Sequence, residues 1–360
     1  MKGTVLAIET SRTLRRAAVM RDGVLDALEI DRLEDRQPAT GALYCARITG
    51  LIPGIGAATA DLGHGIAGFF PDGAGLIPGQ SLLVEIRREA EGDKAARLSP
   101  AIQLRSEHLV FTPARPGINI SRKITEEAER TRLRAALDPF ATKGGFVIRT
   151  EACTQADEAI RAQGLALVEK YTHLCADPAP GLRLAAPDAV ARLLDRAGPG
   201  AAVIADEASL DALPSGLSAR HDPAPFETLD IDTALDTLML PRHDLAEGWL
   251  SIDPTPALVA IDVNTGGAGG GKTALRVNLD AARTIPRLLS LKKLGGLILV
   301  DFAALPKGRD RARIADAFHD AATRYLAEAR VMGWGPAGLL ESVCRRPGRS
   351  LAMLMPEDAR

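Results

Sequence analysis

Two apolar segments that each carry an aspartate near their end constrain the fold of this chain most. The first, residues 257–264, reads ALVAIDVN and contains Asp262 and Asn264. The second, residues 295–302, reads GGLILVDF and contains Asp301. Short apolar runs bounded by glycine are typical of buried strands in a parallel sheet. We therefore expect two parallel strands with a carboxylate near the carboxyl end of each.

The segment between these two strands has the spacing of a helix. Its apolar positions are Leu275, Leu279, Ala282, Leu288 and Leu289. We expect the helix to end after two lysines, at Gly295 and Gly296, and we expect Pro286 to bend or divide it. A strand, a crossover helix and a parallel strand bring both strand ends to one edge of the sheet, where ligands of open α/β sheets bind.

The polar groups expected at this edge suit a hard divalent cation. Magnesium prefers oxygen ligands, takes one or two carboxylates and keeps several waters. Asp262 and Asp301 supply the carboxylates, and the amide of Asn264 lies beside them in sequence. Manganese also favours oxygen ligands, so the pattern predicts Mg²⁺ with Mn²⁺ as an alternative.

The composition is that of an ordinary globular protein. The chain has 360 residues, of which 46% are hydrophobic and 25% charged, enough for roughly two to three domains of about 150 residues. The formal net charge is -2, so any site for a polyanion has to be local. Aromatic residues make up only 4% of the chain, so surfaces that could stack nucleobases are few.

Cysteine spacing and hydropathy indicate the cellular compartment. The four cysteines, Cys45, Cys153, Cys175 and Cys344, lie far apart and form no C-x-x-C motif. We therefore expect neither a structural zinc ion nor a disulfide framework. The N-terminus lacks the apolar core of a signal peptide, and no apolar run reaches about 18 residues. These features predict a cytoplasmic protein without a membrane partner.

A glycine-rich loop follows the first aspartate strand. Residues 266–273, GGAGGGKT, satisfy the phosphate-binding pattern G-x-x-x-x-G-K-[ST], in which Lys272 would bind phosphates and Thr273 magnesium. Five of the first six residues are glycine, so composition alone favours a match. The motif also does not call for the Asp262 and Asn264 that precede it. A flexible loop is the favoured interpretation, with a P-loop NTPase as the competing one.

Several segments, in one order along the chain, resemble the catalytic part of the ribonuclease E/G family. The two aspartate strands carry the closest likeness, and VNLDAA at 277–282 resembles the start of the family's following helix. Segments at 41–47, 53–58, 67–69, 92–98 and 118–124 resemble its RNA-binding barrel and the exit from it. Residues 145–150 resemble its pocket for a 5′-monophosphate, and residues 338–341 resemble the close of its catalytic subdomain.

The resemblance implies a multi-subdomain α+β and α/β fold. An RNase H-like subdomain, residues 1–35 and 183–240, would be interrupted by an OB-type barrel at 36–107 and a 5′-sensor region at 108–182. Short strands with regular turn signals at 36–107 independently predict a small barrel. A DNase I-like catalytic subdomain would occupy residues 241–360.

The resemblance also implies an activity and its residues. The protein would be a magnesium-dependent endoribonuclease of RNA processing or decay. It would cleave single-stranded RNA and favour 5′-monophosphorylated ends. Asp262 and Asp301 would bind the metal, with Asn264 supporting the site. RNA and its 5′-phosphate would be bound by Arg149, Thr150, Arg122, Lys123, Lys94 and Phe69.

The chain departs from the family pattern at several positions. Thr59 stands where the family's barrel carries an aromatic residue, and Phe302 is followed by two alanines where a further aspartate is usual. The family's zinc-linking cysteine motif and small domain have no counterpart, so we expect a monomer or weak homodimer rather than a zinc-linked tetramer. These departures keep a second hypothesis open, a catalytically weak or inactive RNA-binding member.

Overall fold

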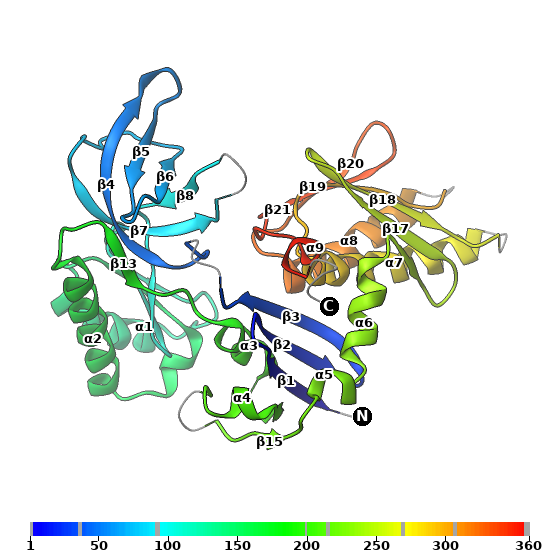
Figure 1. Cartoon of the computed structure of the whole chain (residues 1–360), viewed down its shortest axis with the longest axis horizontal. Helices are drawn as coiled ribbons and strands as arrows, with labels where there is room; N and C mark the ends of the chain where they lie inside the picture. The colour runs from blue at the N-terminus through cyan, green and yellow to red at the C-terminus, as the bar shows by residue number, and fades with distance from the viewer. Residues whose placement is uncertain are drawn as a thin grey trace. The chain divides into compact units, whose positions relative to one another are not determined.

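The computed structural model describes residues 3–34, 38–90, 94–198, 200–213, 217–267, 271–304 and 308–355, leaving aside the side chains of residues 195, 271 and 272. The chain forms two compact units. One consists of Met1–Asp35 with Pro187–Arg360, and the other is Arg36–Ala186. Helices and strands are mixed in both units (Figure 1). No helix in the described ranges is long and apolar enough to cross a membrane.

The unit Arg36–Ala186 contains a closed barrel of five strands. They follow one another around the barrel in the order β4 (Leu43–Ile52), β5 (Ala57–Asp61), β6 (Ala67–Phe70), β8 (Ala96–Ser99) and β7 (Ser81–Arg88), and pairing of β4 with β7 closes it. Alternate side chains such as Ile48, Phe70, Ile86 and Leu98 fill the interior. A short strand, β13 (Gly181–Leu184), pairs with the start of β4. The OB-like barrel expected from the sequence is confirmed.

The rest of this unit is a second sheet packed against two helices. Its strand order is β11 (Ile118–Ile120), β12 (Gly145–Ile148), β10 (Leu109–Thr112) and β9 (Leu104–Arg105), with β11 and β12 parallel. The helices α1 (Glu127–Leu137) and α2 (Asp157–Cys175) bury their apolar faces against it. Short 3-10 turns, η2 (Asp138–Phe140) and η3 (Thr150–Thr154), precede and follow β12.

The first sheet of the other unit is built from both segments of that unit, the N-terminal one and the one that starts at Pro187. Its order is β15 (Arg220–His221), β14 (Ala202–Ala205), β1 (Thr4–Thr10), β2 (Leu14–Arg21) and β3 (Val24–Arg32). The strands β1, β14 and β15 are parallel, whereas β2 and β3 are antiparallel. Both faces are buried, one of them under α3 (Ala189–Ala197). The segments α4 (Glu207–Leu210), α5 (Pro225–Thr228) and α6 (Ile231–Met239) follow β14 in the chain.

The second sheet of this unit holds the two aspartate segments. Its order is β16 (Arg242–Asp244), β17 (Trp249–Pro254), β18 (Leu258–Asn264), β19 (Gly296–Asp301), β21 (Leu340–Cys344) and β20 (Arg330–Trp334). As expected, β18 and β19 are parallel and joined by a crossover helix, α7 (Gly271–Leu291). All other pairings in the sheet are antiparallel. The helix α8 (Gly308–Tyr325) follows β19, and α9 (Leu351–Leu354) comes last among the described elements.

The two aspartate strands were expected to be buried, but only one face of this sheet is buried. Alternate residues such as Leu250, Ile261 and Val300 pack in the core with α7 and α8. The opposite face, called the open face below, is half-buried or exposed; its residues on β17 to β19 include Trp249, Ser251, Asp253, Ala260, Asp262, Asn264, Leu299 and Asp301. Apolar residues on the open face, such as Ala260 and Leu299, hid the alternation that marks a strand solvated on one side.

The helix between the aspartate strands also differs in detail from the expectation. It runs undivided from Gly271 to Leu291 with Pro286 inside it. Its flanking side chains Ile285, Leu288 and Leu289 are buried, and this packing holds the helical path despite the missing N–H of proline. The left-handed residue after the helix is Lys293, with φ 53°, rather than a glycine.

Candidate functional site

Asp262 and Asp301 lie directly opposite each other on neighbouring strands. The parallel pairing of β18 and β19 places the two residues in register. Registered neighbours in a sheet project their side chains to the same side, and both residues are exposed on the open face. Two carboxylates are therefore presented together to solvent at the carboxyl ends of the two strands.

Asn264 is the third residue of this group. It lies two positions after Asp262, and its side chain therefore projects to the same face. Its Nδ2 donates a hydrogen bond of 2.6 Å to Oδ2 of Asp262. This bond fixes the orientation of the Asp262 carboxylate and does not involve its Oδ1.

This donor set fits magnesium better than zinc. Within the described residues, no group of three or more histidines, cysteines, aspartates and glutamates could hold a metal ion. Zinc sites use three or four histidine, cysteine or carboxylate ligands, more than the two carboxylates that β18 and β19 bring together. Two carboxylates with room for several waters match the usual protein contribution to Mg²⁺.

A buried asparagine that sequence reasoning did not single out supports the second carboxylate. Asn278 on α7 is fully buried, its Nδ2 donates to the Ala303 carbonyl at 2.8 Å, and its Oδ1 accepts from the Ala303 N–H at 3.0 Å. This reciprocal pair holds the chain that leaves β19 just after Asp301. The signal in the sequence was the match at residues 277–282, which contains Asn278.

The four residues expected at a 5′-phosphate pocket lie at one edge of the sheet in the other unit. Because β11 and β12 are parallel, the segments that follow them lie side by side. The Ser121 N–H donates to the Ile148 carbonyl at 2.9 Å, and the hydroxyl oxygens of Ser121 and Thr150 are 3.0 Å apart. Arg122 and Lys123 follow Ser121, while Arg149 precedes Thr150.

The cations of this edge are open to solvent. Arg122, Lys123 and Arg149 are all exposed. The Arg149 Nη1 donates to the Glu107 carbonyl at 3.2 Å, and its Nε lies 3.7 Å from the Glu151 carboxylate. Arg149 is thus loosely held, with donors left for a phosphate. The turn that carries Arg122 and Lys123 is fixed by Arg130, whose Nη1 donates to two of its backbone carbonyls.

The residues expected to contact RNA on the barrel lie on its outer surface. Phe69 is half-buried on β6, and Phe70 beside it is fully buried in the barrel interior. Phe69 pairs with Thr59 on one side and with Arg97 on the other. Lys94 is exposed just before β8. Arg97 was not among the candidates, although its place between the buried Ala96 and Leu98 indicates an outward side chain.

The glycine-rich loop lies only partly within the described residues. Residues 268–270 and the side chain of Lys272 lie outside the described part of the chain. Thr273 is half-buried in the first turn of α7.

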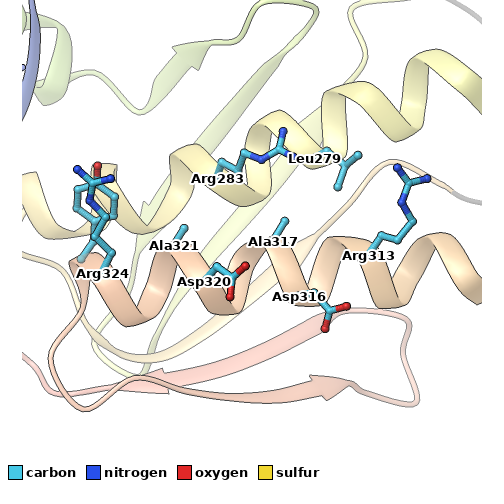
Figure 2. Close-up of a pocket in the computed structure, with 9 residues that line it drawn as sticks. Leu279, Arg283, Arg313, Asp316, Ala317, Asp320, Ala321 and Arg324 are labelled. Atoms are coloured by element: carbon cyan, nitrogen blue, oxygen red, sulfur yellow. The ribbon is translucent and has the colours of Figure 1, made fainter. Parts of the chain in front are cut away.

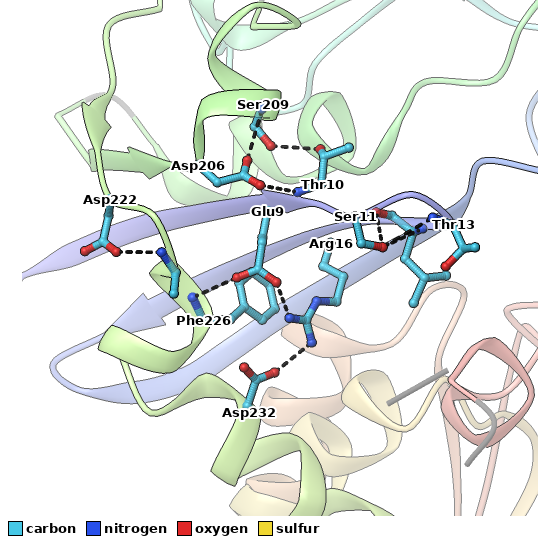
Figure 3. Close-up of polar contacts among 12 residues, drawn as sticks. Glu9, Thr10, Ser11, Thr13, Arg16, Asp206, Ser209, Asp222, Phe226 and Asp232 are labelled. Atoms are coloured by element: carbon cyan, nitrogen blue, oxygen red, sulfur yellow. Dashed lines mark hydrogen bonds and ion pairs between the residues drawn. The ribbon is translucent and has the colours of Figure 1, made fainter. Parts of the chain in front are cut away.

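Three further carboxylates lie at the ends of parallel strands in the first sheet, but each already has partners (Figure 3). Glu9 pairs with Arg16. Asp206 caps α4 by accepting from the Ser209 N–H at 3.0 Å. Asp222 accepts from a backbone N–H at 3.0 Å in the next turn. Their hydrogen bonds account for these carboxylates as parts of the fold.

A pocket of about 660 Å³ lies along α7 and α8 and contains none of the candidate residues. It is lined by charges of both signs, among them Arg283, Arg313, Asp316 and Asp320 (Figure 2). Such a mixed lining gives no preference for an anionic ligand.

Comparison with known proteins identifies the family. The model of the ribonuclease E/G family matches residues 103–197 and 212–346. Ribonuclease G of Haemophilus influenzae is 26% identical over 99% of this chain and 82% of its own length, and that of Escherichia coli K12 is 26% identical over 96% and 80%. Ribonuclease E of a Nostoc species is 29% identical over 89% of this chain and 54% of its own length. The chain belongs to the ribonuclease E/G family.

Proposed function

We propose that this protein is an endoribonuclease that hydrolyses phosphodiester bonds of single-stranded RNA with the help of Mg²⁺. The observation that carries the proposal is the register of Asp262 with Asp301 on the open face, with Asn264 bonded to the first carboxylate. The names of the relatives, ribonuclease G and ribonuclease E, support the same activity. RNA processing or decay is the corresponding role.

The residues divide the work as follows. Asp262 and Asp301 would hold the ion from neighbouring strands, and Asn264 would keep the Asp262 carboxylate oriented. A bound Mg²⁺ supplies a water of lowered pKa and stabilises negative charge on the attacked phosphate. Both carboxylates are exposed, as ligands that share a metal ion with water and a phosphate group have to be.

RNA recognition is proposed at two other places in the chain. Phe69 on the barrel would stack a base, and Lys94 would contact the backbone. Arg149 and Thr150, with Arg122 and Lys123 beside them, would bind a 5′-terminal monophosphate. A guanidinium and a hydroxyl suit the charge and the acceptor oxygens of such a group.

The finer fold assignment belongs to the same proposal. Residues 1–35 and 183–240 would form the RNase H-like subdomain, and residues 241–360 the DNase I-like one. The mixed sheet with β1 between β14 and β2 supports the first assignment. The second is supported by a sheet with helices packed on one face and carboxylates on the other. Within Arg36–Ala186, the barrel would span 36–107 and the sensor region 108–182.

A catalytically weak RNA-binding member is the second candidate. Thr59, which pairs with Phe69, stands where the family carries an aromatic residue, so the barrel surface has one stacking group fewer. The aspartate that usually follows the second metal ligand is also replaced. A P-loop NTPase gains no support from the family comparison.

One cleavage assay tests the proposal against both alternatives. A 5′-monophosphorylated single-stranded RNA is incubated with Mg²⁺ and with the wild-type protein, Asp262→Asn or Asp301→Asn. We expect each substitution to slow cleavage at least about 100-fold, and Asp253→Asn, an exposed change on the same face, to leave the rate unchanged. Cleavage that persists in both variants would contradict the metal site. If the wild type binds RNA without cleaving it, the catalytically weak RNA-binding member is favoured. If the wild type hydrolyses ATP and Lys272→Ala does not, the P-loop NTPase is favoured.

The 5′-end preference has its own test. Cleavage rates are compared for RNAs that differ only in a 5′-monophosphate or a 5′-hydroxyl. We expect Arg149→Ala to bring the ratio of the two rates close to one, while Arg161→Ala, an exposed arginine on α2, keeps the wild-type ratio. An unchanged ratio in Arg149→Ala would remove this residue from the pocket.

A further inference from the structure

Trp249 lies on the open face, one strand away from the metal-binding candidates. It is the first residue of β17 and pairs directly with Asn264 on β18. The Cβ atoms of such a pair are about 4.5–5.5 Å apart. The next residue on that face of β17, Ser251, pairs with Asp262. The indole is therefore a nearest neighbour of the residue that hydrogen bonds the Asp262 carboxylate.

The backbone beside Trp249 is unusually close to β18. Gly248 adopts a φ of +88°, and a Cβ placed there would lie 2.2 Å from the Asn264 carbonyl oxygen. Only glycine permits this approach. The start of β17, and with it Trp249, is thereby held against Asn264.

An arginine on the next strand lies over one face of the indole. The guanidinium carbon of Arg242 lies 4.7 Å from the centroid of the Trp249 ring. Its Nε and Nη2 donate to one carboxylate oxygen of Asp244, at 3.2 and 3.1 Å. The buried His243 between them keeps Arg242 and Asp244 on the open face. Arg242 retains donors that this carboxylate does not use.

The other tryptophan of the chain has a structural role, and the contrast is informative. Trp334 packs against the core, lies 5.7 Å from the ring of Phe302, and donates its Nε1–H to the Arg311 carbonyl at 3.1 Å. Trp249 and Trp334 are both half-buried and each has an arginine over its ring, but Trp249 is not among the residues packed against that core. Its surroundings are Arg242, Asp244 and Asn264, which are polar and face solvent.

We propose that Trp249 and Arg242 form a nucleobase-binding subsite for the nucleotide next to the scissile phosphate. This inference rests on the proposed function, because it assumes that RNA is cut at Asp262 and Asp301. The base stacks on the indole, and the free donors of Arg242 bind the adjoining phosphate. Stacking of this kind tolerates any base identity. The subsite places an aromatic residue beside the proposed metal site. The barrel of this chain has Thr59 where the family carries an aromatic residue.

A fluorescence experiment tests the stacking directly. Trp334→Phe leaves Trp249 as the sole tryptophan of the full-length chain, since the sequence contains two. Combined with Asp301→Asn to prevent cleavage, it is titrated with single-stranded RNA and with an equally long abasic phosphodiester strand. We expect quenching of the Trp249 emission by the RNA and not by the abasic strand. Equal responses to the two strands would overturn the subsite.

Cleavage of an abasic series tests its position. RNAs of one sequence carry a single abasic nucleotide at successive positions around the cleavage site. With wild-type protein, KM should rise about tenfold for one position beside the scissile bond, the size expected for one lost stack. Trp249→Ala should raise KM for the intact RNA about tenfold as well, and its KM should no longer depend on where the abasic nucleotide lies. Trp249→Phe should keep part of this dependence on the abasic position, and Trp334→Phe should keep all of it.

The outcomes separate this inference from the function on which it rests. If Asp262→Asn and Asp301→Asn still cleave while the Trp249 emission is quenched, the metal site is wrong and the stacking surface stands. If both abolish cleavage but Trp249→Ala shows the wild-type abasic profile, the subsite is wrong and the nuclease stands. Thermal melting of each variant establishes that a loss of binding is not a loss of folding.

Discussion

Asn264 decides how the Asp262 carboxylate is presented, because its amide holds Oδ2 at 2.6 Å. Without this bond the carboxylate can rotate about its last torsion, and a metal ion has to fix it at an entropic cost. We expect Asn264→Ala to raise the Mg²⁺ concentration for half-maximal cleavage about 10- to 100-fold, as for other residues that orient metal ligands. A Mg²⁺ titration of the cleavage rate measures this. Asn119→Ala, at an exposed position on β11, is the control, and identical titrations for the two variants would contradict the role.

At this scale the sequence predicted residues with distinctive chemistry and missed those defined by their neighbours. Asp262, Asn264 and Asp301 were singled out because carboxylates and amides are conspicuous within apolar runs, and the structure places them side by side. Trp249 and Asn278 carry no such mark, since their significance depends on a pairing between β17 and β18 and on a turn held by α7. Strand register and helix docking are tertiary properties that one sequence does not display.

Lys292 supplies a prediction for pH dependence. Burial lowers its pKa to about 8, against an opposing effect of the Asp253 charge. Its Nζ donates to two backbone carbonyls at the end of α6, including that of Leu240 at 2.9 Å. Between pH 8 and the ordinary lysine value of 10.5, the unfolded chain binds more protons at this residue than the folded one. As the pH rises through that window, the contribution of Lys292 to the free energy of unfolding therefore increases.

The effect is measured as the difference in melting temperature between the wild type and Lys292→Met. We expect this difference to shift in favour of the wild type as the pH rises from about 7.5 to about 9.5, because only the wild type carries the titrating group. A constant difference across this range would mean that the lysine titrates normally in the folded protein.

At the scale of elements, β12 depends on one glycine. A Cβ at Gly145 would lie 1.9 Å from the Arg115 carbonyl oxygen and 2.8 Å from that of Gly117. Both atoms belong to the backbone, so neither can turn aside as a side chain would. We expect Gly145→Ala to lower the free energy of unfolding by about 2–3 kcal/mol and to weaken any 5′-end preference. Gly54→Ala, whose methyl group meets nothing within 4 Å, should be nearly neutral in the same urea titrations.

The presence of elements with strong local signals was predicted from the sequence. Which of their faces are buried was not. The strand–helix–strand unit of β18, α7 and β19 and the closed barrel followed from periodicity, turn residues and resemblance. The half-buried character of β18 and β19 did not, because Ala260 and Leu299 are apolar on the open face. The undivided path of α7 through Pro286 likewise depends on packing that a local propensity cannot express.

At the scale of the whole molecule, the chain leaves one compact unit after Asp35 and returns to it at Pro187. The inserted unit has its own apolar cores, built from residues between Ala42 and Ala186. The other unit buries residues from both flanking segments together. The five-part division drawn from the sequence stays a prediction, because its finer boundaries depend on how much each part contributes to a shared core.

Fragments of the inserted unit distinguish these levels of organisation. We expect residues 36–186 to fold alone with one cooperative thermal transition, since the unit's core contacts stay inside it. Residues 36–107 should be markedly less stable. This shorter fragment lacks β13, which pairs with β4, and it exposes Leu43 and Leu83, which pack with the core of the second sheet. Circular dichroism melting compares the two, and equal stability would show that the barrel is an independent domain rather than part of a larger folding unit.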